Sequence, residues 1–181
     1  MMQVTPGFGA SVATELKGNA HHQRVISHQD IVRSQVIPAV SAAQYADGQC
    51  VGGELSFSGV VRLAGDVSEL AAVEVSLRGL STPADLDVVL YPDNLNTAPT
   101  NGNDFTLLSD EVQNVLGVVR IPASAFVALG GHHFAKVVPA APLLIEAANG
   151  VSSIRAAVVA RGPIELAASD SLVLGLVTRR S

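Results

Sequence analysis

Two adjacent histidines, His132 and His133, are the residues of this chain whose type best suits metal binding. A metal site of the cupin kind needs two histidines two positions apart, so that both leave a strand on the same side, with a glutamate shortly after them. Neighbouring residues of a strand point to opposite faces, and Glu146 is distant in sequence. The spacing therefore does not favour a metal site, and a cupin-like metalloenzyme is kept only as a third hypothesis.

A second group of polar side chains lies in the segment 92–106, PDNLNTAPTNGNDFT. Carboxylate and amide oxygens of this kind suit calcium, but their order does not match an EF-hand loop. Asparagine, aspartate, proline and glycine also favour turns, so a long exposed loop is the alternative interpretation. Whether this loop binds an ion stays open from the sequence. Its oxygen-bearing residues are Asp93, Asn94, Asn96, Asn101, Asn103 and Asp104.

The remaining reactive residue types predict no catalytic site and no cofactor. Asp85 and Asp87 share one face of a strand, as acids on a solvated face commonly do. Cys50 is the only cysteine, which excludes an intramolecular disulfide, and it is interpreted as a small buried hydrophobic residue. There is no G-x-S-x-G nucleophile motif and no phosphate-binding glycine loop that leads into a helix.

The composition argues for a protein that associates with other protein chains. Apolar residues make up 48% of the chain and charged residues only 15%, against about 25% in an average soluble domain. No window holds the roughly 18 uninterrupted apolar residues of a membrane span. The net charge is −5 and no basic patch with interleaved aromatics is visible, so nucleic-acid binding is not expected. A surface with so few charges is expected to be buried partly against neighbouring chains.

Alternating hydrophobicity predicts an all-β fold. In the stretch 71–92, Val73, Val75 and Leu77 alternate with polar residues, and a second strand follows over 86–91 with Asp87 on its solvated face. Further strands are expected over 31–40, 54–63, 118–122, 133–138 and 143–147, with a bulge or bend at Gly59. The segments 153–161 and 171–178 are apolar at nearly every position, which is typical of strands covered on both faces by a loop, an arm or a neighbouring subunit.

These elements predict one β-sandwich or jelly roll of about eight or nine strands over residues 31–181. One short helix of about two turns, capped by Ser109 and ended by Gly117, is expected between two strands. Residues 1–30 contain few apolar residues and several glycines, so they predict an extended N-terminal arm that orders against a neighbour, or a disordered tail. A short helix over 11–17 is a further possibility within this arm.

Four runs of the sequence together resemble small structural proteins of tailed bacteriophages. They are YADGQCVGGELSF at 45–57, ADLDVVLYPDN at 84–94, VLGVVRIP at 115–122 and IRAAVVARGPIELAASDSLVLGLV at 154–177. The resemblance covers about residues 35–178 and is greatest to auxiliary head proteins, known as decoration or cement proteins. It implies a β-sandwich or jelly roll with a binding role on the capsid lattice, and it implies no catalytic residues.

The first hypothesis from the sequence is therefore a non-enzymatic virion protein, made in the host cytoplasm, that binds the major capsid protein and stabilises contacts between capsomers. Self-association as a dimer or trimer is expected, without nucleic acid, membrane or cofactor. A tail or receptor-facing structural protein is the alternative. The residues expected to contribute to partner binding lie in the arm and in the loop after residue 91; they are Phe8, Val25, Ile26, Asp93, Asn94 and Asn96.

Overall fold

The computed structural model of the chain describes residues 10–17, 20–27, 30–41, 44–78, 82–93, 95–166 and 171–180, and for the first two of these ranges it describes the backbone alone. Two single-turn 3-10 helices, η1 (Val112–Asn114) and η2 (Ala123–Ala125), accompany the strands. The strands are β1 (Ala10–Lys17), β2 (Ala20–Ser27), β3 (Asp30–Val36), β4 (Gln44–Tyr45), β5 (Cys50–Ser58), β6 (Val67–Arg78), β7 (Leu86–Tyr91), β8 (Gly117–Ile121), β9 (Val127–Leu129), β10 (His132–Val137), β11 (Leu143–Glu146), β12 (Ser153–Ala160), β13 (Ile164–Glu165) and β14 (Leu172–Arg180).

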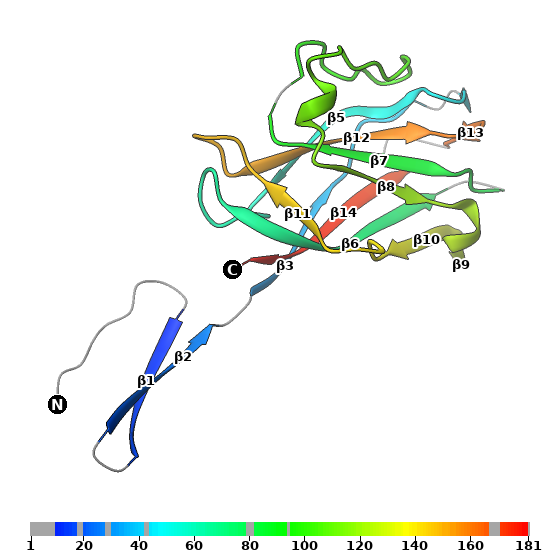
Figure 1. The fold of residues 1–181 in the computed structure, drawn as a ribbon. Helices are drawn as coiled ribbons and strands as arrows, with labels where there is room; N and C mark the ends of the chain where they lie inside the picture. Colours follow the sequence, from blue (N-terminus) through cyan, green and yellow to red (C-terminus); the bar gives the residue numbers. More distant parts are fainter. Residues whose placement is uncertain are drawn as a thin grey trace.

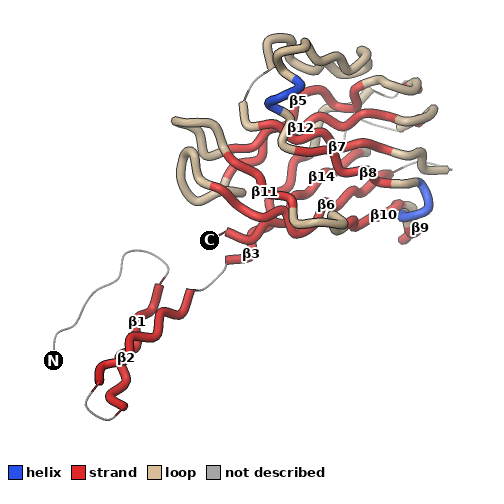
Figure 2. The backbone as a smooth tube through the Cα atoms, viewed as in Figure 1, coloured by secondary structure: helices blue, strands red, loops and turns tan. Residues whose placement is uncertain are grey.

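The long strands form two sheets that pack face to face (Figures 1 and 2). One sheet has the order β3-β14-β6-β10-β9, with β11 also paired to β6, and the other has the order β5-β12-β7-β8. The antiparallel pairs are nested along the chain: β3 with β14, β5 with β12, β6 with β10 and β7 with β8. This nesting in two sheets is a jelly roll, the architecture of viral capsid domains, lectins and cupins. The predicted fold class is confirmed.

The alternation seen in the sequence builds the core between the sheets. Val73, Val75 and Leu77 of β6 are fully buried and pack with Leu174 and Leu176 of β14 in one cluster. Burial of each such side chain contributes about 1.5–3 kcal/mol relative to leaving it in water. The described sandwich has twelve strands rather than eight or nine, because β4, β9 and β13, of two or three residues each, were not predicted.

The prediction of a solvated face on β7 is wrong. Every residue of β7 is buried, including Asp87, which is 8% exposed. Its carboxylate accepts a hydrogen bond from Nε of Arg161 at 2.7 Å, so an ion pair, in place of hydration, stabilises the buried charge. On β6, Glu74 is likewise only 8% exposed. The acidic residues of these strands therefore have cationic partners elsewhere in the chain, and they do not indicate a solvated face.

Two local predictions also need correction. The expected two-turn helix after Ser109 is the single 3-10 turn η1, and no side chain caps it. Gly59 follows the end of β5 with φ +70°, so it starts a turn and does not interrupt the strand. The segment 41–53, which lies between two of the predicted strands, contains β4 and the beginning of β5.

The region predicted as an N-terminal arm contains a hairpin. Strands β1 and β2 pair antiparallel over their whole length, from Ala10 opposite Ser27 to Lys17 opposite Ala20, and they form a two-stranded sheet of their own. The possible helix over 11–17 is therefore wrong. Figure 1 shows the hairpin outside the two sheets of the sandwich. Asp30, the last residue of the predicted arm, begins β3.

Candidate interaction surface

The outer face of the six-stranded sheet has the largest group of solvent-exposed aliphatic side chains. We call it the bare face; within the described residues no loop lies across it. Ile31 leaves β3 on the side opposite to Val36, which packs on the core, and Leu144 leaves β11 opposite to the buried Ile145. The exposed aliphatic residues of its strands include Ile31 at 72%, Leu144 at 62%, Val127 at 59%, Leu129 at 55% and Val67 at 40%, and Ile37, just beyond β3, is 62% exposed.

A row of three charged residues crosses the middle of the bare face. Arg33 on β3 approaches Glu74 on β6 at 2.6 Å, and Lys136 on β10 approaches the other carboxylate oxygen at 3.3 Å. Gly175 of β14 lies between β3 and β6, and a Cβ there would lie 3.6 Å from the Glu74 carboxylate. The side chains of Arg33 and Lys136 are 54% and 51% exposed, whereas that of Glu74 is 9% exposed. The row therefore presents two cations to solvent above a buried carboxylate.

The outer face of the four-stranded sheet is covered, in contrast to the bare face. Residues 92–116, here called the loop layer, lie over it (Figure 1). Leu95, Phe105, Leu107 and Val115 of this layer pack on a second small core, separate from the main one, formed by Cys50, Val89, Tyr91, Ala157 and Val159. The sequence prediction that β12 is covered on both faces is thus confirmed, and a loop provides the cover.

One polar side chain, that of Asn101, fastens the loop layer to the sandwich, and another, that of Glu111, joins two parts of the layer to each other. Oδ1 of Asn101 accepts hydrogen bonds from the Tyr45 hydroxyl at 2.7 Å and from the Gly52 amide at 2.8 Å. The carboxylate of Glu111, which is 3% exposed, accepts hydrogen bonds from the amides of Leu108 and Asn96. The segment is therefore a folded layer, and the expectation of a freely exposed loop holds only for its outward side chains.

The residues predicted to bind a partner are divided among these regions. Asp93 and Asn96 are exposed at the start of the loop layer. Val25 and Ile26 lie on β2, opposite Val12 and Ser11 of β1. Phe8 and Asn94 lie outside the described residues. The bare face, with Arg33, Glu74 and Lys136, was missed because its row of charges forms only when β3, β6 and β10 are in register.

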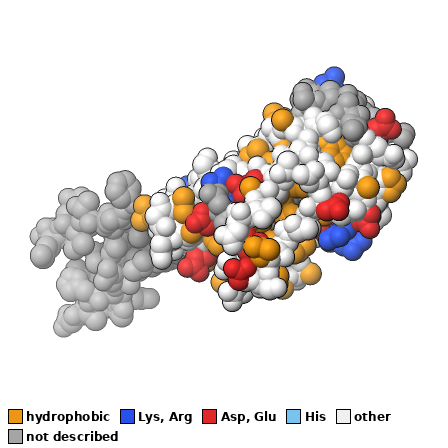
Figure 3. Space-filling model, turned by 90° about the horizontal axis from the view of Figure 1, so that it is seen from above, with side chains coloured by type: hydrophobic (Ala, Val, Ile, Leu, Met, Phe, Trp, Pro, Cys, Tyr) orange, Lys and Arg blue, Asp and Glu red, His pale blue; other side chains and the backbone are white. Residues whose placement is uncertain are grey.

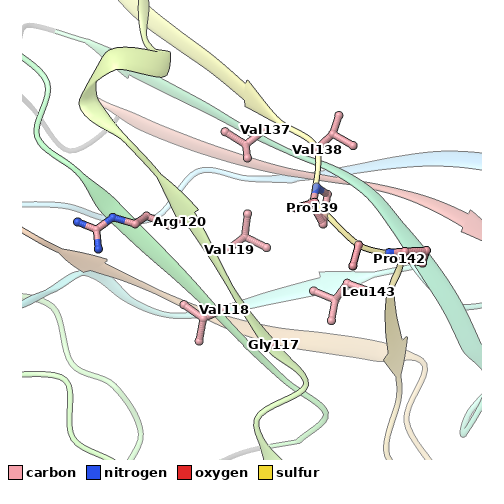
Figure 4. Close-up of a pocket in the computed structure, with 11 residues that line it drawn as sticks. Gly117, Val118, Val119, Arg120, Val137, Val138, Pro139, Pro142 and Leu143 are labelled. Carbon is pink, nitrogen blue, oxygen red and sulfur yellow. The ribbon is translucent and has the colours of Figure 1, made fainter.

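A cleft of about 480 Å³ opens between β8 and the segment that joins β10 to β11 (Figure 4). Its lining is mostly aliphatic and includes Val118, Val138, Pro139 and Leu143, together with Arg120. Strand β8 is an edge strand whose partner is β7. The cleft is therefore an apolar groove beside a sheet edge, and no acid-base pair lines it.

The acid next to this cleft has a structural role. Asp85 accepts hydrogen bonds from the Ala123 amide and from Arg120, both at 2.7 Å. These two bonds, that of the amide first, lower the pKa of Asp85 below its ordinary value. Asp85 and Asp87 thus each hold a different partner, and they do not form a carboxylate pair.

Within the described residues, the histidines considered for metal binding do not form a metal site. His132 and His133 are consecutive on β10 and opposite Arg78 and Leu77 of β6. Among the residues that the structure describes, no group of three histidine, cysteine or acidic side chains could hold a metal ion. The same residues include no helix with the length and apolar character needed to cross a membrane.

Cys50 is fully buried, as predicted, and burial raises the pKa of its thiol to about 11. Because this pKa lies above the ordinary value of 9.0, the thiol stabilises the fold below about pH 9, and the stabilisation is lost as pH rises through 11. We expect wild type to lose about 2 kcal/mol more free energy of unfolding than Cys50→Ala between pH 8 and pH 11. Urea unfolding of both proteins at the two pH values measures the difference.

The comparison with the alanine variant isolates the thiol. Burial, followed by the charge of Glu54, also raises the pKa of Tyr91, so both proteins are expected to become less stable in alkali. Equal losses of stability in wild type and Cys50→Ala would show that the thiol does not contribute.

Comparison with known proteins gives distant structural neighbours and no curated sequence relative. No family model matches the chain, and no curated protein matches it in sequence. A solved structure titled Desmodium yellow mottle tymovirus aligns over 98% of this chain and 95% of its own, with 11% identity and a TM-score of 0.28. The assignment of the fold rests on the nested strand pairing itself.

Proposed function

We propose that this protein is a non-enzymatic structural component of a virion that binds the capsid lattice and stabilises contacts between capsomers. The observation that carries the proposal is the hairpin β1–β2, which precedes the jelly roll and forms a sheet of its own. An isolated two-stranded hairpin is marginally stable in water, so it needs a surface to pack on. Attachment to a capsid through this hairpin would supply that surface.

Three further features support a binding role. The jelly roll is an architecture used by viral capsid domains, although it also occurs in lectins and cupins, so function must be argued from surfaces. The bare face exposes aliphatic side chains at β3, β9 and β11, and such groups mark protein–protein contact. The sequence resemblance to decoration and cement proteins of tailed phages agrees with both. The proposed location is the virion, after synthesis in the host cytoplasm.

The test is removal of residues 1–29, which leaves Asp30 in place to pair with Arg62 and Arg180. We expect the shortened protein to bind shells of the proposed virion's major capsid protein at least tenfold more weakly than the full chain, about 1.4 kcal/mol or more. Co-sedimentation of purified protein with empty shells measures the affinity. The sandwich is expected to keep its unfolding temperature, because its core lies within β3–β14.

A shorter deletion serves as the matched control. Removing residues 1–9 keeps β1 and β2 but takes away Phe8, so it separates the hairpin from the segment before it. Equal shell binding by the full chain and the protein without residues 1–29 would contradict attachment through the hairpin. Copy number addresses the alternative: hundreds of copies per particle fit the capsid, and a handful would instead indicate a tail component.

A further inference from the structure

We infer that the two outer sides of the jelly roll bind each other in neighbouring copies, with the loop layer of one copy on the bare face of the next. The two sides differ in charge and share exposed aliphatic residues. The inference concerns contacts between copies of this chain and does not depend on how the protein attaches to a capsid.

The first step is the charge of the loop layer. Residues 92–116 contain four acidic residues and no lysine or arginine. Asp93, Asp104 and Asp110 are exposed, while the fourth acid, Glu111, is buried beneath them. Asp47 adds another exposed acid beside this layer, because the neighbouring Gly48 accepts a hydrogen bond from the Phe105 amide. Figure 3, which views the molecule from above, shows acidic side chains among hydrophobic ones, with some Lys and Arg side chains also in view.

The second step is the opposite arrangement on the bare face. There the carboxylate of Glu74 is buried, and the groups that reach solvent above it are the guanidinium of Arg33 and the ammonium of Lys136. Arg179 is 46% exposed on the same face, and its partner Glu69 is 31% exposed. Exposed Arg78 adds a fourth cation to this side, and exposed Glu146 adds an acid beside Leu144. Cations therefore outnumber acids on the bare face, whereas the charged residues of the loop layer are all acidic.

Both surfaces also carry exposed aliphatic side chains that a contact between copies could bury. In the loop layer, Leu108 is 49% and Val112 is 58% exposed, and on the bare face Ile31 and Leu144 are more than 60% exposed. Buried aliphatic area supplies affinity, while complementary charge selects the partner and sets the orientation. The bare face of one copy and the loop layer of another meet both requirements.

The geometry of the fold decides the form of such an assembly. The four-stranded sheet separates the loop layer from the main core, and the six-stranded sheet closes that core on the other side, so the two surfaces point in opposite directions (Figure 1). Contact between unlike surfaces is heterologous; it produces a ring if the rotation closes and an open chain if it does not. The inference thus predicts head-to-tail self-association, not a two-fold symmetric dimer.

The test uses two charge variants at positions whose own side chains form no ion pair within the described residues; Ile31 and Leu144 lie opposite Arg179 and Glu69, respectively, in the sheet. In the face variant, Ile31→Glu and Leu144→Glu place acids on the bare face. In the loop variant, Asp104→Lys and Asp110→Lys place cations on the loop layer. All four side chains are exposed, so both variants are expected to fold as the wild type does. Glu165→Lys, at an exposed acid of β13 outside both surfaces, is the control for a change of charge.

Sedimentation velocity of the full chain over a range of concentrations gives the result. We expect wild type and Glu165→Lys to self-associate, more weakly in about 0.5 M salt because exposed charges are then screened. Each charge variant alone should associate at least tenfold more weakly. Mixed together, the two variants should associate in a one-to-one ratio. The acidic face of the first then fits the basic loop layer of the second, and the unchanged loop layer of the first fits the unchanged bare face of the second.

Two outcomes would overturn the inference. One is a wild-type protein that stays monomeric at every concentration in low salt. The other is self-association that neither pair of substitutions weakens. Failure of the two weakened variants to associate in a one-to-one ratio on mixing would count against the inference in the same way. Shell binding through the hairpin could persist in either case, so the failure of this inference is distinct from the failure of the proposed function.

Discussion

Replacement of Gly52 by alanine is expected to lower the free energy of unfolding by about 2–4 kcal/mol. Gly52 lies within β5 at φ +85°, a backbone conformation that residues with a Cβ rarely adopt. An added Cβ would also meet the ring of Pro38, with Cγ at 2.7 Å. A proline ring cannot rotate away, so the backbone around residue 38 or β5 itself would have to move. Urea unfolding of wild type and variant measures the loss.

Gly59 provides the control, because it has a similar φ of +70° but no atom within 4 Å of an added Cβ. Gly59→Ala should therefore lose only the backbone contribution, about 1 kcal/mol. The difference in free energy of unfolding between the two variants measures the cost of the steric contact between the added Cβ and Pro38. Equal losses at Gly52 and Gly59 would show that the proline contact adds nothing to the backbone strain.

Hydrophobic periodicity was enough to predict the fold class. Alternation over 73–77 and the apolar runs after residues 153 and 171 correspond to β6, β12 and β14. Both apolar runs became central strands of a sheet. The outer face of β12 lies beneath the loop layer, whereas that of β14 lies on the bare face, so the prediction of cover on both faces is met within the described residues by β12 alone. Pattern alone could not divide the strands between two sheets, because β6 and β7, adjacent in sequence, belong to different ones.

Charged residues within strands were the main source of error. The sequence assigned Asp87 to a solvated face, yet its partner Arg161 is 74 residues away along the chain. Glu74 likewise finds Arg33 and Lys136 on two other strands. Such pairs exist only after the sheets are in register, so the sequence gives no local sign of them. The bare face could not be predicted for the same reason.

The hairpin, by contrast, had a local signal that was missed. Strands β1 and β2 are separated by the two residues Gly18–Asn19, a dipeptide that favours hairpin connections. Val12 and Thr14, which are β-branched, also favour strand over helix. The low apolar content of residues 1–30 instead favoured an extended arm or a tail, with a helix over 11–17 as a further possibility.

Removal of the Glu111 carboxylate is expected to release the loop layer while leaving the jelly roll folded. The carboxylate accepts hydrogen bonds from the amides of Asn96 and Leu108, which join two points of the loop twelve residues apart. In Glu111→Ala both amides lose their acceptor, at about 1–3 kcal/mol for each donor left without a partner. The main core is a separate cluster, so the opening should be local.

Hydrogen exchange distinguishes local opening from global unfolding. In Glu111→Ala we expect amides of residues 95–108 to exchange at least tenfold faster than in wild type, while amides of β6 and β14 keep their protection. Asp110→Ala is the matched control: it removes the same charge from the neighbouring position, where the side chain is exposed. Uniformly faster exchange across both sheets in Glu111→Ala would show that the loop layer and the jelly roll unfold as one unit. Unchanged exchange in the loop would mean that packing of Leu95, Phe105 and Leu107 on the second core holds the layer without the carboxylate.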